Sequence, residues 1–159
     1  MEALKRALKS LAAERAREGL GLKRDFEQRI ANLSEALPRI EKLSAAARDN
    51  TKRNFQTRLR ELLEDAPLNE KRIYEDAVIA ANHGDITEEM TRLGVHLKAF
   101  KDLLRKSGAA GKAIEFLLQE INREINTIGA KSQDAQLSQI TVAMKSEVEK
   151  MREQVQNVE

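Results

Sequence analysis

The sequence contains no cysteine, and this absence excludes a disulfide framework, a thiolate nucleophile and a zinc site built on sulfur. Aromatic residues make up only 3% of the chain, so it lacks the stacking platform that binders of single-stranded nucleic acid use. No apolar run approaches the roughly 20 residues that a membrane-spanning helix needs. The N-terminus also lacks the apolar core of a secretory signal. We therefore expect a cytoplasmic protein with no membrane segment.

Glycine and proline are scarce as well, with 7 and 2 occurrences in 159 residues. Few residues therefore interrupt helices, and 34% of the chain is charged, which is typical of solvated helical surfaces. No stretch alternates apolar and polar residues with a period of two, so we predict no strands. The composition predicts an all-α protein.

The first half of the chain is predicted to form a long helical hairpin or arm, residues 1–64. Residues 2–36 carry an amphipathic helical pattern, and a second such pattern covers residues 39–64. Pro38 lies between them and predicts a boundary or a kink, since proline lacks a donor and disfavours helix at the preceding residue. The outer face of the second predicted helix is basic: Arg48, Lys52, Arg53, Arg58 and Arg60.

The second half, residues 65–159, is predicted to form a compact helical domain. Asp85, with Glu88 three residues later, has the spacing of a capping box. The glycine-rich stretch 107–111 lacks the spacing of a phosphate-binding loop, which favours a plain linker between helices. The predicted helices are 70–82 (capped by Asn69), 86–106, 112–128 and 134 to the end, with turns at 82–85 and 129–133.

The two halves differ in charge. Residues 1–64 carry 15 Lys and Arg against 10 Asp and Glu, whereas residues 65–159 carry 13 against 16. A basic half joined to an acidic half suits a protein that holds a polyanion with one part and a metal ion with the other. Two solvated surfaces of unequal charge explain the same counts, so both interpretations stay open.

The helix predicted at 112–128 carries two carboxylates on the face opposite its apolar stripe. Glu120 and Glu124 are four residues apart, so they lie close together on one side of the helix. Like charges at this spacing cost a few tenths of a kcal/mol, roughly. A cation between them would offset this cost, and so would the alternation with Arg123.

The preceding predicted helix carries Glu89, Arg92 and His96 along one flank of its apolar stripe. A single histidine beside such a stripe is more often a structural residue than a ligand. If this flank faces Glu120 and Glu124, however, the imidazole and the carboxylates form a plausible site for Mn²⁺ or Mg²⁺. A salt-bridge network between the helices would explain the Arg and Glu residues, but not His96.

Four segments of the chain match motifs of one known family. Near the N-terminus the matching residues are Arg15, Glu18, Gly19, Leu22 and Asp25. The other three segments are DITEEMTRLGVH at 85–96, FLLQEINREINT at 116–127 with Lys131, and KMREQVQNVE at 150–159. Together they resemble the YicC family, a bacterial family of metal-dependent endoribonucleases long labelled stress-induced proteins. The similarity covers nearly the whole chain; it is close from residue 85 onward and looser from about 30 to 70.

This resemblance implies a metal-dependent endoribonuclease, assembled as a homo-oligomer, that binds RNA along its basic arm. Cleavage of a phosphodiester needs charge stabilisation on the phosphate and a group that moves a proton. The residues expected to be catalytic are His96, Glu120, Glu124 and Arg123. The expected ligands of Mn²⁺ or Mg²⁺ are Glu120, Glu124 and His96, with Glu89 a weaker candidate. The residues expected to bind RNA phosphates are Arg92, Lys131, Lys52, Arg53 and Arg58.

The chain departs from this family in two ways. Family members carry an additional N-terminal domain of comparable size, and we expect this chain to begin after it. Val95 precedes His96 where the family commonly has serine, and residues 113–115 read Ala-Ile-Glu in place of Lys-Leu-Asp. The charged residues are retained, so the expected chemistry stands. The competing interpretation is a non-catalytic helical assembly or RNA-binding scaffold. The orientation of His96 relative to Glu120 and Glu124 discriminates between the two.

Overall fold

Four helices, and no strand, make up the part of the chain that the computed structural model describes, which confirms the all-α prediction. The described residues are 1–65, 84–106, 111–132 and 134–156, with side chains placed in all of them except 59–65. The helices are α1 (Glu2–Asp65), α3 (Thr87–Leu104), α4 (Gly111–Lys131) and α5 (Ala135–Gln156).

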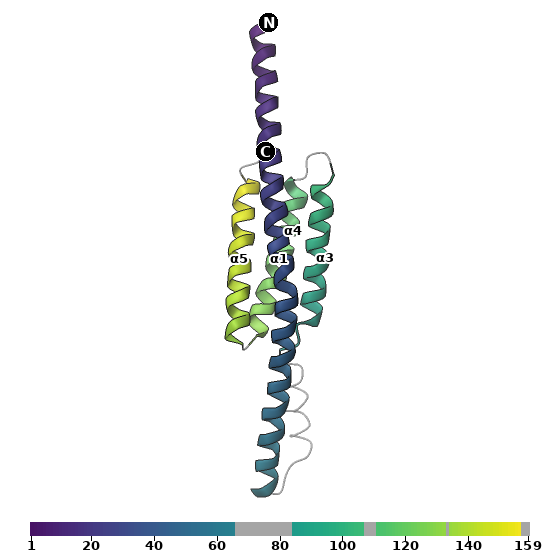
Figure 1. The fold of residues 1–159 in the computed structure, drawn as a ribbon, viewed down its shortest axis with the longest axis vertical. Coiled ribbons are helices and arrows are strands. Elements are labelled where there is room, and N and C mark those ends of the chain that lie inside the picture. The colour runs from purple at the N-terminus through teal and green to yellow at the C-terminus, as the bar shows by residue number, and fades with distance from the viewer. Residues whose placement is uncertain (66–83, 107–110, 133, 157–159) are drawn as a thin grey trace.

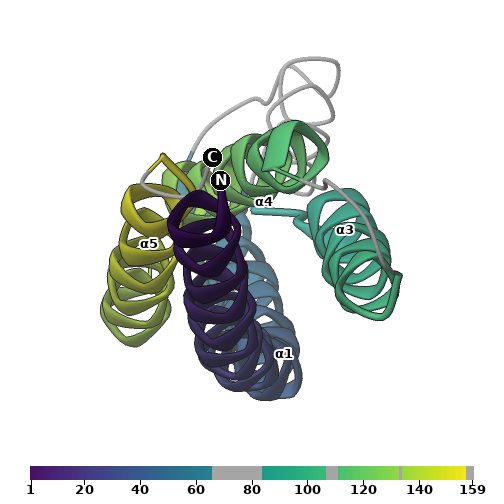
Figure 2. The same cartoon turned by 90° about the horizontal axis from the view of Figure 1, so that it is seen from above.

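The three shorter helices pack around the middle of α1, whose two ends project beyond them (Figure 1). Contacts run from α1 to α3, from α3 to α4, from α4 to α5 and from α5 back to α1. Seen from above, α1 and α4 therefore lie diagonally opposite, with α3 and α5 on the two sides (Figure 2). Neighbouring helices run in opposite directions, as in an up-down-up-down four-helix bundle.

All four helices contribute to one hydrophobic core. The spacing of three and four residues seen in the sequence gives each helix an apolar stripe, and the stripes meet along the bundle axis. Phe26 of α1 and Phe100 of α3 pack edge to face, with ring centroids 5.9 Å apart. Side chains with no exposed surface come from every helix: Ile30, Ile40, Leu93, Phe100, Leu118, Ile121, Ile125, Ile128, Val148 and Met151.

The predicted hairpin between residues 2–36 and 39–64 is wrong, because α1 is one uninterrupted helix that contains Pro38. Proline removes the helical hydrogen bond to the carbonyl of Ser34, and Pro38 lies at an exposed position of the helix. Leu33 and Ile40, on either side of Pro38, are buried in the same core. These core contacts hold the two parts of α1 in one helix.

The shorter helices lie close to their predicted positions. The helix expected at 112–128 continues to Lys131, so Gly129 lies inside α4 and not in a turn. A side chain there would meet α5, because a Cβ built on Gly129 lies 3.2 Å from Thr141 Oγ1. The helix predicted at 70–82 lies outside the described residues. The division into a 1–64 arm and a 65–159 domain stays a prediction, although Phe26 and Ile40 of α1 belong to the common core.

The projecting ends of α1 carry two exposed surfaces. Near the N-terminus lies a set of leucines at helical spacing with 48% to 62% of their surface exposed, which we call the N-terminal leucine stripe: Leu4, Leu8 and Leu11. Toward the other end lie three exposed cations, the basic segment: Lys52, Arg53 and Arg58. None of the described helices is both long and apolar enough to cross a membrane.

Candidate metal centre

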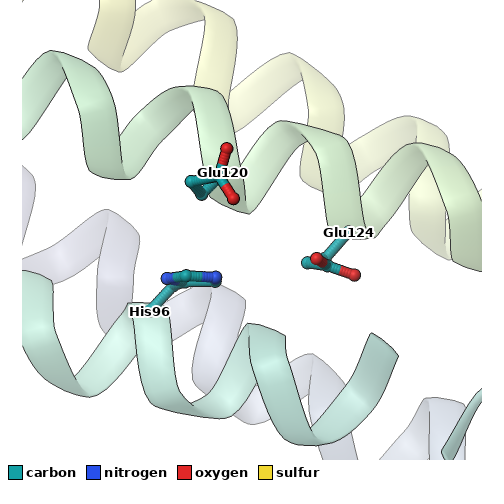
Figure 3. A group of neighbouring side chains, drawn as sticks. All are labelled: His96, Glu120 and Glu124. Atoms are coloured by element: carbon teal, nitrogen blue, oxygen red, sulfur yellow. The ribbon is translucent and has the colours of Figure 1, made fainter. Parts of the chain in front are cut away.

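The antiparallel packing of α3 against α4 brings His96 opposite Glu120 and Glu124. One nitrogen of the His96 ring and one oxygen from each carboxylate all lie within 4.8 Å of one another. Figure 3 shows the imidazole on α3 and the two carboxylates on successive turns of α4, reaching into the space between the helices. The structure thus places His96 toward the carboxylates and not away from them.

All three side chains have atoms free to bind a ligand. Neither nitrogen of the half-buried His96 ring has a hydrogen-bond partner in the part of the chain that the structure describes. Among the residues that the structure describes, Glu120 forms one ion pair, with its Oε2 3.7 Å from Arg123 Nη1. Glu124 is only 2% exposed, and its Oε2 is buried with no hydrogen-bond partner among the described residues. A buried carboxylate oxygen without a donor costs free energy unless something binds it.

The spacing of these atoms suits a divalent cation. With metal–oxygen bonds of about 2.1 Å, ligand atoms of an octahedral ion lie roughly 3 to 4.2 Å apart. The three ligand atoms already lie within 4.8 Å of one another, so small side-chain rotations would bring them to these distances. One imidazole nitrogen with two carboxylate oxygens is a donor set that divalent cations such as Mn²⁺ accept. The residues present therefore fit the metal expected from the sequence.

A chain of ion pairs adjoins the cluster and links the same two helices. Arg92 on α3 donates its Nε–H to Glu124 Oε1 on α4, with 2.9 Å between the atoms. The Arg92 guanidinium also pairs with Glu88 and lies 3.5 Å from Glu89 Oε1. Lys131, at the end of α4, donates to Glu89 Oε1 at 2.9 Å. Both Glu89 and Glu124 are thus buried acids with cationic partners.

These contacts shift two ionisation equilibria. Burial opposes the ionised form of Glu89, but the hydrogen bond from Lys131 and the charges of Lys131 and Arg92 outweigh it. The pKa of Glu89 therefore lies below its usual value. The hydrogen bond to Glu124 holds the pKa of Arg92 above its usual value. Glu89 and Arg92 are therefore both ionised at neutral pH.

The start of α3 is fixed to the end of α4, and this sets the register of the site. Gly84 has a positive φ of 95°, a conformation that glycine adopts without strain, and it turns the chain into α3. Asp85 Oδ1 accepts from the backbone N–H of Thr87 at 2.9 Å, while Lys131 donates to the Asp85 carbonyl at 3.1 Å. The N-cap is Ile86, one residue later than predicted, and Glu88 pairs with Arg92 instead of completing a capping box.

The other expected site residues lie in different surroundings. Glu89 is not part of the His96 cluster, because its carboxylate pairs with Lys131 and Arg92. The Arg123 side chain is 73% exposed beside Glu120. The basic segment lies on the part of α1 that projects beyond the bundle (Figure 1). The sequence interpretation missed the ion pair of Glu88 with Arg92, although their i,i+4 spacing could have indicated it.

A four-helix bundle with a histidine and two carboxylates converging between facing helices is a scaffold suited to metal binding. Residues 40–159 match the family model described as endoribonuclease YicC-like, C-terminal, so the chain belongs to this family. A protein of Clostridioides difficile (strain 630) named probable endoribonuclease YicC is 38% identical over 159 residues, covering 99% of this chain and 54% of that protein. The protein of the same name from Haemophilus influenzae (strain ATCC 51907 / DSM 11121 / KW20 / Rd) is 34% identical over 154 residues, 96% of this chain and 52% of that protein. The chain thus spans about half the length of these relatives.

Proposed function

We propose that this protein takes part in metal-dependent cleavage of RNA, and that His96, Glu120 and Glu124 hold the divalent cation. The names of the relatives, probable endoribonucleases, support RNA as the substrate. The metal proposal rests on three potential ligand atoms, from His96, Glu120 and Glu124, that lie within 4.8 Å of one another. Glu124 also has a buried oxygen for which the described residues provide no hydrogen-bond donor. A salt-bridge network alone gives no reason for His96 to face these carboxylates.

The residues of the site have separable roles in this proposal. A bound Mn²⁺ or Mg²⁺ would supply positive charge to stabilise the negative charge that develops on the phosphate. Glu120 and Glu124 bind that ion from two turns of α4, and His96 either completes the ligand set or moves a proton with its free ring nitrogen. Arg123, exposed beside Glu120, offers a guanidinium to the phosphate oxygens. The basic segment holds RNA phosphates further along α1.

A cleavage assay tests the proposal. The purified chain is incubated with labelled structured RNA, with Mn²⁺ or with EDTA, beside His96→Asn and a control, Lys145→Met. Lys145 is exposed on α5 and makes no ion pair among the described residues. We expect cleavage with Mn²⁺, none with EDTA, and a loss of cleavage in His96→Asn while its helical circular-dichroism spectrum and the activity of the control are unchanged. Cleavage that persists in EDTA would contradict metal dependence.

A non-catalytic assembly role is the second candidate, and the N-terminal leucine stripe favours it. Leucines half exposed on a projecting helix form an apolar surface of the kind that marks protein contacts. A second copy of the chain is a suitable occupant, in line with the homo-oligomer expected for the family. Light scattering after size exclusion should show an oligomer that dissociates when the stripe is changed to serine. A monomer at micromolar concentration would contradict assembly through this stripe.

A further inference from the structure

The guanidinium of Arg92 is already paired with carboxylates of the protein, unlike that of an arginine available to bind a phosphate. Its guanidinium faces three carboxylates, with Nε 2.9 Å from Glu124 Oε1, a second nitrogen 3.5 Å from Glu89 Oε1, and a third paired with Glu88. The Glu124 and Glu89 side chains are only 3% and 4% exposed, so Arg92 is a principal source of positive charge for both buried acids. All three guanidinium nitrogens of Arg92 thus face carboxylates of the protein itself.

We propose that Arg92 is a positioning residue, which fixes the Glu124 carboxylate for cation binding and does not itself contact RNA phosphate. The proposal rests on the proposed function, since it takes Glu124 as a metal ligand. A glutamate side chain has several rotatable bonds, and a ligand that must be ordered on binding loses affinity. The bond from Arg92 Nε occupies Oε1 and orders the carboxylate in advance, while Oε2 has no hydrogen-bond partner within the described part of the chain. Such outer hydrogen bonds commonly raise metal affinity by about 10- to 100-fold.

Simple electrostatics makes the opposite prediction. Arg92 brings a positive charge to a carboxylate that would bind a cation, so on charge alone its removal should strengthen metal binding. A positioning role requires that removal weaken metal binding, because Glu124 then loses its fixed orientation. A phosphate-binding role predicts a third result: unchanged metal affinity with weaker, less salt-dependent RNA binding. The sign of the change in metal affinity therefore separates the roles.

The experiment measures Mn²⁺ affinity by calorimetry in the full chain, in Arg92→Gln and in Arg92→Lys. Arg105→Gln is the matched control: Arg105 is the C-cap of α3, and its side chain is 77% exposed. Within the described part of the chain its one ion pair is with Asp102, at 3.5 Å. We expect Arg92→Gln to weaken Mn²⁺ binding by about tenfold. Arg92→Lys should lose less, because it keeps the charge but not the planar donor geometry. The control should match the unmodified chain. RNA binding in EDTA, measured against salt, should keep its slope in Arg92→Gln.

Each result of these measurements either supports or overturns the positioning role of Arg92. Unchanged or tighter Mn²⁺ binding in Arg92→Gln would overturn the positioning role, as would a flattened salt dependence of RNA binding. If Arg92→Gln fails to fold by circular dichroism, Arg92→Lys carries the test, and metal affinity equal to that of the unmodified chain would overturn it. Glu120→Gln separates this failure from that of the proposed function. Loss of Mn²⁺ binding in Glu120→Gln with no effect at Arg92 would reject only the positioning role. No Mn²⁺ binding by the unmodified chain would reject both.

Discussion

Replacing Lys131 with methionine should destabilise the protein through Glu89, in a way that depends on pH. Lys131 Nζ donates to Glu89 Oε1 at 2.9 Å and to the Asp85 carbonyl at 3.1 Å, so it ties the end of α4 to the start of α3. Methionine keeps most of the aliphatic length of lysine and removes the charge. The buried Glu89 carboxylate is then left with Arg92, 3.5 Å away, as its remaining cationic partner among the described side chains.

The size of the effect follows from these contacts. A hydrogen bond to a charged group contributes about 1.5–3 kcal/mol. The Lys131 side chain is 41% exposed, so solvent screening places the loss at the lower end, about 1.5 kcal/mol. For a chain of this size such a loss lowers Tm by about 3–6 °C. Thermal unfolding followed by circular dichroism measures it, with Lys145→Met as the control for loss of an exposed lysine.

The pH dependence gives the sharper check. The pKa of Glu89 lies below its usual value of 4.5 in the folded protein, despite the opposing effect of burial. The stability that this shift contributes is fully present above pH 4.5 and is lost as pH falls through the lowered folded pKa. The difference in Tm between the unmodified chain and Lys131→Met should therefore be largest at pH 7 and should shrink below pH 4.5. A difference in Tm that is the same at pH 7 and below pH 4.5, or a Tm that Lys131→Met leaves unchanged at pH 7, would refute the reasoning.

Two further predictions concern α1. Changing the whole basic segment to glutamine should flatten the dependence of RNA affinity on salt, since each phosphate contact releases condensed counterion; an unchanged slope would place RNA elsewhere. Pro38→Ala should raise the free energy of unfolding in urea by about 1–2 kcal/mol, because alanine restores a helical donor at an exposed position while making the unfolded chain less restricted. A loss of stability would mean that the helix depends on proline at this position.

The helices could be predicted from the sequence because their apolar stripes repeat at the helical period. Three of the four described helices begin and end within a few residues of the expected positions. Pro38 misled the prediction for α1. A local rule predicts a break at proline, but buried Leu33 and Ile40 on either side of it pack into the same core. Tertiary packing outweighs the missing hydrogen bond, and periodicity within one helix carries no information about such packing.

The candidate site was predictable in its members and not in its geometry. The spacing in the sequence put Glu120 and Glu124 on one side of their helix, on the face expected to be solvated. In the structure Glu124 is 2% exposed, because α4 is covered by α3 on one side and by α5 on the other. The meeting with His96 depends on the register of α3 against α4, which Lys131 and the turn at Gly84 help to fix. The apolar pattern of one helix does not encode which residues of a neighbouring helix it will contact.

The central claim, that His96, Glu120 and Glu124 hold one divalent cation, is tested most directly by pulsed electron paramagnetic resonance of Mn²⁺ bound to the full chain. An imidazole nitrogen bound to Mn²⁺ modulates the electron spin echo. The account predicts one bound Mn²⁺ with this modulation, which disappears in His96→Asn even though the sequence retains a second histidine, His83. It also predicts weaker Mn²⁺ binding in Glu120→Gln, with metal-free stability nearly unchanged. Unchanged Mn²⁺ affinity in Glu120→Gln together with a large loss of metal-free stability would contradict the metal centre and assign the cluster to a salt-bridge network.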